Sequence, residues 1–372
     1  MAYDVIVSGQ LCADLLPDAT KLPLSALSSP GKLFEIGALT VATGGSVANT
    51  GLAFKRLGVN VGLMSSIGDD LLGQMITSKL NEYEGHLGDL LQVRPGDVSS
   101  YSVIISPENT DRIILHCPGI NEQFDVADVD FEVVRDAKLF HLGYPTLLPR
   151  LTANGGEALA TIYQRVAAMG VITSMDLTHP DPNSPNGKLD WKQILANVLP
   201  YVDIFLPSIE EIIFMLRRTD YDRWQGRAFP HVTQSYLNDL GSDLLSMGVK
   251  IAGFKLGEYG FYIKTAPDVT NFRRFERRLG LDPLLWPDLE LYQPAFDVQV
   301  VGATGAGDCA YAGFLTSLLH QASPQAAIRF ACAVGACNVE SPDATSGLRS
   351  WDATQARIAQ GWALSERRLV MR

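Results

Sequence analysis

The chain carries, at residues 298–315, the sequence VQVVGATGAGDCAYAGFL. A β-branched run leads into three glycines, and an apolar pattern with helical spacing follows them. Glycine lets a ligand approach the backbone closely, and the amides of Gly305, Ala306 and Gly307 would lie at a helix N-terminus, where the macrodipole favours negative charge. This segment therefore predicts a strand, a turn and a helix that together hold an anionic group.

Asp308 follows these amides directly, which is an unusual place for a carboxylate beside an anion. One interpretation is that Asp308 accepts a proton from a substrate hydroxyl while the amides stabilise phosphoryl oxygens. The other is that it satisfies free amides in the first turn of the helix, which is the commonest use of aspartate there. The spacing alone leaves both interpretations open.

Short apolar runs alternate with longer helical patterns along the rest of the chain. The expected strands are Asp4–Ser8, Lys138–Leu142, Val171–Asp176, Asp203–Leu206, Lys250–Lys255 and Val298–Val301. The expected helices are Ser46–Leu57, Asp70–Tyr83, Gly155–Met169, Trp191–Leu199, Ser208–Leu216 and Thr233–Met247. This alternation predicts an α/β fold in which helices cover both faces of a mostly parallel sheet. Ligands of such folds bind outside the carboxyl ends of the strands.

Two extended, β-branched segments, Lys32–Thr43 and Tyr101–Cys117, have no crossover helix after them. The second contains a turn signal at Pro107–Thr110. We expect a small antiparallel sheet that projects from the main sheet as a lid, and an ordinary edge meander is the alternative.

The composition of the 372-residue chain restricts its partners. Its formal net charge is −11, so it offers no basic field for nucleic acid. No stretch is apolar enough to span a bilayer, and the chain begins without the pattern of a signal peptide. The five cysteines are scattered, without a C-x-x-C pair, which is typical of reduced intracellular thiols. We expect a cytoplasmic protein that binds neither nucleic acid nor membrane.

Two common phosphate-binding devices do not explain the glycine-rich segment. The Gly-Lys pairs at Gly31 and Gly187 are each followed by leucine, so the Walker motif is absent. The pattern G-x-G-x-x-A occurs at Gly305, but it opens no βαβ unit and lacks the acidic residue expected about 20 positions later.

A second glycine turn enters a helix at Thr43–Gly58, with the sequence TGGSVANTGLAFKRLG. Together, the two segments resemble the N-terminal and C-terminal signatures of the ribokinase-like (PfkB-type) carbohydrate kinase family. Ile67–Gly73, Pro118–Asn121 and Lys255–Gly260 are similar to further family motifs in the expected order. The resemblance covers roughly residues 3 to 350.

The resemblance implies a Rossmann-like three-layer αβα sandwich, one domain over residues 1–372, with a small β-sheet lid formed by about 11–43 and 99–120. It implies transfer of the γ-phosphoryl group of ATP to a sugar hydroxyl, with ATP and Mg²⁺ required. By the family pattern, Asp308 is the catalytic base, and Gly305, Ala306 and Gly307 form the anion hole. The matching sugar-binding positions are Asp14, Gly44, Gly45, Asn49 and Asn121. The matching nucleotide-side positions are Ser208, Glu211, Lys255, Gly257 and Thr304, with Glu211 acting on Mg²⁺ through a bound water.

This sequence departs from the family pattern at several positions. Ser208 replaces the asparagine of the N-x-x-E motif, and Gly302 and Ala303 replace the Asp-Thr pair of the C-terminal signature. Cys12 and Ser46 replace an asparagine and a lysine of ribokinases, which argues against ribose itself as the substrate.

Other functions stay open at this point. A nucleoside kinase of the same superfamily would need apolar walls for a base, and Phe34, Tyr101 or Tyr144 could supply them, although each is an ordinary packing residue by default. The changes at Ser208, Gly302 and Ala303 would also suit a non-catalytic sugar or nucleotide sensor. A homodimer through the lid is a further expectation.

Gly302 leads to a testable prediction about monovalent cations. In family members that K⁺ activates, the aspartate at this position helps to bind the ion. Because glycine has no carboxylate, we expect the same rate in K⁺ and in Na⁺ at equal ionic strength. A several-fold gain in rate on replacing Na⁺ by K⁺ would contradict this prediction.

Overall fold

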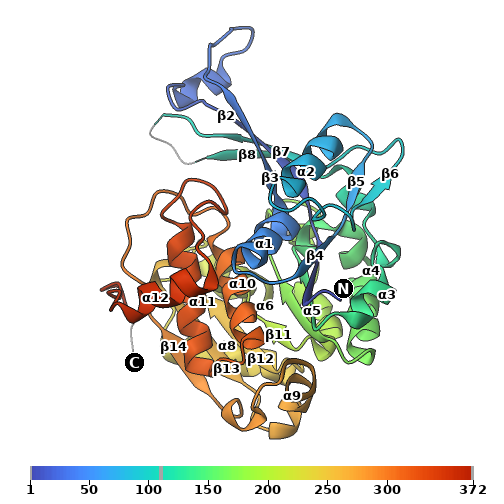
Figure 1. Cartoon of the computed structure of the whole chain (residues 1–372). Coiled ribbons are helices and arrows are strands. Elements are labelled where there is room, and N and C mark those ends of the chain that lie inside the picture. The colour runs from blue at the N-terminus through green and yellow to red at the C-terminus, as the bar shows by residue number, and fades with distance from the viewer. Residues whose placement is uncertain (1, 109–111, 370–372) are drawn as a thin grey trace.

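The computed structural model describes residues 2–108 and 112–369, and an eight-stranded sheet lies at its centre (Figure 1). The spatial order of the strands is β14-β13-β12-β11-β10-β9-β1-β4. Their bounds are β1 Val5–Gly9, β4 Val61–Met64, β9 Leu139–Gly143, β10 Ile172–Asp176, β11 Ile204–Phe205, β12 Ile251–Lys255, β13 Phe261–Thr265 and β14 Glu290–Gln293. Neighbours from β4 to β12 are parallel, and β13 pairs antiparallel with both β12 and β14.

Two layers of helices cover this sheet, because both faces of its strands are apolar. Val5 and Val7 of β1 belong to one buried core, whereas Ile6 between them belongs to the other. The first core includes residues of α1 Gly45–Arg56, α2 Leu71–Asn81, α9 Arg273–Leu279, α10 Ala306–Leu319, α11 Pro324–Asn338 and α12 Trp351–Ala359. The second includes residues of α3 Phe131–Asp136, α4 Pro149–Ala168, α5 Trp191–Val198, α6 Ile209–Leu216 and α8 Gln234–Ser246, and α7 Arg218–Arg223 packs beside them. The α/β three-layer expectation is confirmed.

A second, four-stranded sheet projects from the body of the molecule, at the top of Figure 1. Its order is β3-β2-β7-β8, with bounds β2 Cys12–Pro17, β3 Leu39–Gly44, β7 Tyr101–Ile105 and β8 Ile113–Cys117. The β2–β3 and β7–β8 pairs are antiparallel, but β2 and β7 run parallel, so the expectation of a purely antiparallel sheet is wrong. A small pair, β5 Ser66–Gly68 with β6 Gln92–Arg94, lies apart from both sheets.

The expected elements are found with their ends shifted by at most two residues, with three exceptions. The strand expected at Lys32–Thr43 begins only at Leu39. Helix α4 begins at Pro149, and non-helical backbone at Ala153–Gly156 separates its first turn from the predicted helix. The turn expected at Pro107–Thr110 is not counted among these exceptions, because it lies partly outside the described residues.

The strand predicted at Val298–Val301 is the third exception and is wrong. Val300 and Val301 are 64% and 57% exposed, and the amides of Val301 and Gly302 donate to the Val339 carbonyl rather than to a strand. The β-branched run is therefore an irregular connection into α10, because its last amides bond to the end of α11 and not to a strand.

None of the helices in the described part of the chain combines the length and the apolar character needed to cross a bilayer.

Helices α10 and α11 pack closely because a glycine lies between them. A Cβ atom on Gly313 would lie 2.8 Å from Cγ2 of Val334, closer than side chains approach one another. Gly313 therefore brings α10, which carries the glycine-rich turn, into a fixed position against its neighbour.

We predict that Gly313→Val lowers the free energy of unfolding by about 2 kcal/mol, because the added side chain overpacks this interface. Gly85→Val is the matched control, since Gly85 is exposed and its Cβ would meet open space. Urea unfolding of the two variants measures the difference. Equal stability of both variants would contradict the close packing.

Candidate active site

The glycine-rich turn leaves the first amides of α10 without a side-chain cap. Gly305 is the N-cap residue, and its φ of +72° is a left-handed conformation that favours glycine. A Cβ at Gly305 would also lie 2.8 Å from the Cβ of Ala344. The helix that follows has 14 residues, so its free amides and its dipole together offer a place for an anion.

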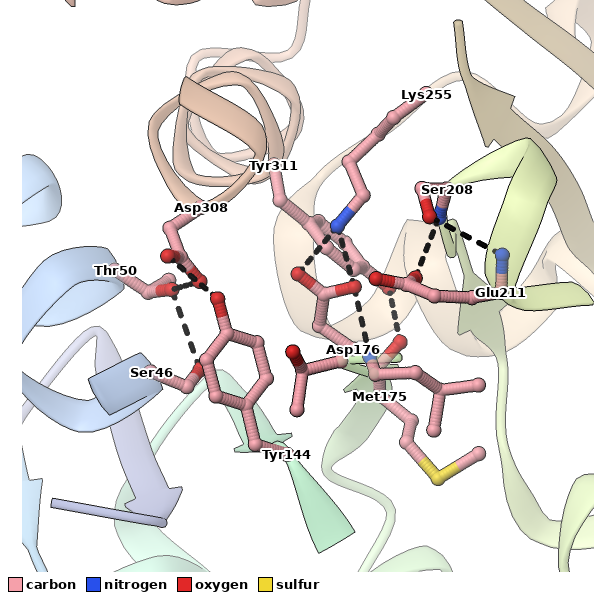
Figure 2. Close-up of polar contacts among 12 residues, drawn as sticks. Ser46, Thr50, Tyr144, Met175, Asp176, Ser208, Glu211, Lys255, Asp308 and Tyr311 are labelled. Carbon is pink, nitrogen blue, oxygen red and sulfur yellow. Dashed lines mark hydrogen bonds and ion pairs between the residues drawn. The ribbon is translucent and has the colours of Figure 1, made fainter. Parts of the chain in front are cut away.

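Asp308 lies in the first turn of α10, and its carboxylate is held by three donors. Its Oδ2 accepts from Asn49 Nδ2 at 3.0 Å and from the Tyr144 hydroxyl at 2.7 Å, and its Oδ1 accepts from Thr50 Oγ1 at 3.2 Å. Figure 2 shows Thr50 and Tyr144 on either side of it. Asp308 is 2% exposed, so its carboxylate is shielded from bulk water.

The environment of Asp308 sets its proton affinity. Burial raises the pKa of Asp308, and this effect outweighs the Lys255 ammonium and the three hydrogen bonds, which lower it. A carboxylate whose pKa is raised is a stronger base when ionised. The competing interpretation, a carboxylate that satisfies amides of its own helix, does not account for these three partners from other elements.

A second polar cluster lies at the carboxyl ends of β10 and β12. Lys255 Nζ donates to both oxygens of Asp176, each at 2.6 Å (Figure 2). Asp176 is fully buried, and the pKa of Lys255 is raised because the charges of Asp176, Glu211 and Asp308 outweigh its burial. One ammonium thus faces three carboxylates in a largely dry environment.

Three carboxylates lie near one ammonium in this cluster, and the pKa values of Asp176 and Glu211 are raised. Burial raises the pKa of Asp176 to about 7, with Lys255 opposing the shift and Glu211 and Asp308 adding to it. Burial also raises the pKa of Glu211. A further cation near this cluster would be electrostatically favoured.

Ser208 and Glu211 form a capping box at the start of α6. The Ser208 amide donates to Glu211 Oε2 at 2.7 Å, and the Glu211 amide donates to Ser208 Oγ at 3.4 Å. Ser208 also forms a parallel bridge with Lys255, which places α6 beside the lysine. In the described residues, no group of three or more His, Cys, Asp or Glu side chains is arranged to hold a metal ion.

A cavity of about 540 Å³ lies beside this cluster, against the first turn of α10. Lys255, Gly257, Ala306 and Gly307 line it, together with residues of the 295–303 segment and of α11. Gly257 has a φ of +55°, which lets the chain turn sharply at the cavity edge. Thr304 is not among the lining residues, and its hydroxyl accepts a hydrogen bond from Arg112, beside β8.

Residues near the end of the described chain form the outer wall of this cavity. Ser365 and Arg367 line it, and the Ser365 amide donates to the Ala295 carbonyl at 2.8 Å. Arg367 makes an ion pair with Glu258, which also lines the cavity. The segment that carries Ser365 and Arg367 is therefore part of the cavity wall.

The expected sugar-binding residues gather where β2, β3 and α1 meet. A Cβ on Gly44 would lie 2.2 Å from Asp14 Oδ2, so a larger residue there would displace the Asp14 side chain. Gly45 has a φ of +85°, and a Cβ on it would lie 2.7 Å from the Gln10 carbonyl oxygen, so glycine is required at this position. Asn49 contacts Asp308 directly, as described above. Asn121 is buried, and its amide group donates to the Leu11 carbonyl at 3.0 Å.

Four residues of the site are missing from the expected set. Asp176 is a charged residue at the end of a predicted strand, and this position could have indicated it as a site residue. Thr50 and Arg112 have no local pattern that distinguishes them. Tyr144 appears among the expectations only as a possible wall for a base, and its contact with Asp308 depends on tertiary structure.

Gly302 lies where a larger residue would not fit. Its Cβ would lie 2.9 Å from backbone atoms of Ser341 and Pro342. The backbone as it stands therefore has no space for the aspartate of the related motif.

Comparison with known proteins relates this site to one family. Residues 3–351 match the profile described as pfkB family carbohydrate kinase. An uncharacterized sugar kinase of Archaeoglobus fulgidus is 26% identical over 300 residues, covering 80% of this chain and 98% of that protein. A ribokinase of Arabidopsis thaliana, solved with ribose and ATP, has a TM-score of 0.70 at 19% identity and covers 96% of this chain and 98% of its own. A putative ribokinase II of E. coli, solved with ATP and Mg²⁺, has a TM-score of 0.68 at 20% identity and covers 97% of this chain and 100% of its own.

The raised pKa of Asp176 predicts how stability depends on pH. Between about pH 4 and pH 7 the folded protein keeps a proton on Asp176 that the unfolded chain releases, so the free energy of unfolding falls as pH rises through this window. The side chain of Asp176→Asn cannot ionise. We therefore expect the free energy of unfolding of this variant, measured by urea titration, to differ less between pH 5 and pH 7 than that of the parent chain.

Asp18→Asn is the control, because Asp18 is exposed and its pKa is lowered mainly by its hydrogen bonds to Thr20. We expect this variant to keep the fall in stability seen in the parent chain. An unchanged fall in Asp176→Asn would show that Asp176 does not titrate in this window.

Proposed function

The chain belongs to the pfkB family of carbohydrate kinases, and from this we propose that Asp308 is the base through which it transfers the γ-phosphoryl group of ATP to a hydroxyl of a sugar or sugar derivative. The class of enzyme follows from the family: a phosphotransferase with an alcohol group as acceptor. The single observation that carries the finer proposal is the Asp308 carboxylate, buried and held by three donors beside the uncapped amides of α10.

In this mechanism Asp308 takes the proton of the acceptor hydroxyl as that oxygen attacks the γ-phosphorus in line. The amides of Gly305, Ala306 and Gly307 stabilise the charge that develops on the phosphoryl oxygens. Rigid positioning of both groups on one helix supports the proposal, because little reorganisation is needed when the reaction occurs.

The 540 Å³ cavity fits the nucleotide side of this reaction. Lys255 and Gly257 line it, and Lys255 brings a positive charge to the place where phosphates would meet the first turn of α10. Ser208 lies beside Lys255, and Thr304 lies next to the anion-hole residues, so both could contact phosphate. ATP is therefore proposed to extend from this cavity toward Asp308.

The donor set also fits a magnesium ion held mainly by phosphate oxygens and water. Asp176 and Glu211 form a buried acidic surface with too little positive charge of its own. As the family pattern implies, Glu211 would act through a water of the ion, with one of its oxygens held by the Ser208 amide. When bound, Mg²⁺ would neutralise charge on the phosphates.

The sugar would lie between the main sheet and the four-stranded sheet, over Gly44 and Gly45. Asp14 and Asn49 offer a carboxylate and an amide, which suit neighbouring hydroxyl groups. We propose Asn121 as a further contact and the four-stranded sheet, over about 11–43 and 99–120, as a lid of the single domain 1–372. Arg112 supports the lid proposal, because it links the segment beside β8 to Thr304 at the anion-hole turn.

Two expectations about the whole protein stay predictions. Exposed apolar residues on the lid segments, including Leu33, Phe34 and Leu115, fit a homodimer through the lid. The five cysteines are all unpaired, which fits the reduced environment of the cytoplasm.

Asp308→Asn tests the proposed mechanism. The amide cannot accept a proton, so we expect turnover to fall by about a thousandfold, while the dissociation constants of ATP and the sugar stay within about threefold. The parent enzyme is first screened for ATP consumption with hexoses, pentoses, sugar acids and nucleosides, and the variant is assayed with the best acceptor.

The outcomes of this screen separate the alternatives. Near-normal turnover of Asp308→Asn would remove Asp308 as the base. Selective use of a nucleoside would favour a nucleoside kinase, and binding without ATP consumption across the panel would favour a non-catalytic sensor.

A further inference from the structure

Tyr144 makes the shortest of the three hydrogen bonds to Asp308, although nothing in the family pattern above assigns it a role. Its hydroxyl donates to Asp308 Oδ2 at 2.7 Å, and the residue follows directly after β9 (Figure 2). The ring lies between Ser46 on one side and Asp176 on the other (Figure 2). The contact joins segments 164 residues apart, so it exists only in the folded protein.

The backbone at Tyr144 adopts a conformation that non-glycine residues seldom take. Its φ is 59° and its ψ is 47°, the left-handed region, which is unfavourable for a tyrosine. The Tyr144 amide donates to the Asp176 carbonyl at 3.1 Å, and its carbonyl accepts from the Leu147 amide at 2.9 Å. Glycine would take this conformation without strain, so the strained turn marks a position where the side chain itself is used.

The three donors do not use every acceptor position of the Asp308 carboxylate. A carboxylate has about four lone-pair positions, two on each oxygen. Among the residues that the structure describes, Asn49 and Tyr144 both donate to Oδ2, whereas Thr50 is the one side chain that donates to Oδ1. The acceptor position left for a substrate hydroxyl is therefore on Oδ1.

We propose that Tyr144 is a positioning residue that holds Asp308 Oδ2 and thereby directs the substrate hydroxyl to Oδ1. The inference rests on the proposed role of Asp308 as the base. The hydroxyl proton passes to Oδ1, the hydroxyl oxygen forms the new bond to the γ-phosphorus, and the bond from that phosphorus to the nucleoside diphosphate breaks.

Tyr144 also affects the acidity of the base. Lys255, Asp176, Glu211 and Cys309 are the other charged or titratable groups near Asp308. Among the effects on Asp308, burial raises its pKa most, and the Tyr144 hydroxyl is one of the donors that lower it. The phenol stays a donor, because burial and the nearby carboxylates raise the pKa of Tyr144 well above its usual value.

Tyr144→Phe removes the hydroxyl and keeps the ring. We expect kcat to fall about tenfold and the acid limb of the kcat/KM profile to move to higher pH by about one unit, because the carboxylate loses a donor that stabilises its ionised form. KM for ATP should stay unchanged, since Tyr144 is not among the residues that line the cavity.

Tyr163→Phe is the matched control. Tyr163 is also buried, and its hydroxyl donates at 2.8 Å to the Ser174 carbonyl, not to Asp308. This variant should keep the parent pH profile. An acid limb of Tyr144→Phe that coincides with that of the parent, or an equal shift in Tyr163→Phe, would overturn the proposal.

A second replacement tests the same bond without deleting it. A difluorotyrosine at position 144 has a more acidic phenol and donates a stronger hydrogen bond, so the acid limb should move to lower pH, opposite to Tyr144→Phe. This replacement keeps the ring and the contact, and it therefore also serves if Tyr144→Phe folds poorly. A shift to higher pH, or no shift, would contradict the proposal.

The test also separates this inference from the function on which it rests. If Asp308→Asn keeps near-normal turnover, the assignment of the base fails. If Asp308→Asn is inactive and Tyr144→Phe has the parent pH profile, the base stands and only the role of Tyr144 is overturned.

Discussion

The ion pair between Lys255 and Asp176 is the interaction on which the site depends. It joins the carboxyl ends of β10 and β12 across β11, and it lies where α6 and α10 both begin. Burying charges is unfavourable unless they are paired, and Lys255 is the ammonium that compensates for Asp176, Glu211 and Asp308 together. Burial, which the Lys255 charge offsets only in part, explains why the pKa values of these carboxylates are raised.

Much of the fold could be predicted because the central sheet is buried on both faces. Strands such as Val5–Gly9 begin with three consecutive apolar residues, and helices such as α6 begin at a polar cap that is visible in the sequence. The strand predicted at 298–301 shows the limit of this reasoning. A β-branched run forms a strand only where it pairs with a neighbouring strand, and here the amides of Val301 and Gly302 donate to the Val339 carbonyl at the end of α11.

The candidate site could be predicted where its residues belong to glycine turns, and not where they meet through tertiary structure. Asn49 and Asp308 lie in recognisable motifs, and the structure joins them by a hydrogen bond. Tyr144 and Arg112 reach the same region from other segments, and no local spacing indicates this. Ser208, which replaces the asparagine of the family pattern, has a structural role in this protein. Its hydroxyl accepts from the Glu211 amide, and the Glu211 side chain accepts from the Ser208 amide, so the two residues cap α6.

The part of the cavity wall that lies near the end of the described chain has a different consequence. Ser365 and Arg367 line the cavity, yet they lie beyond residue 351, where the match to the family ends. Substitutions at these two positions alter the rim without touching Lys255, Asp308 or the helices that carry them.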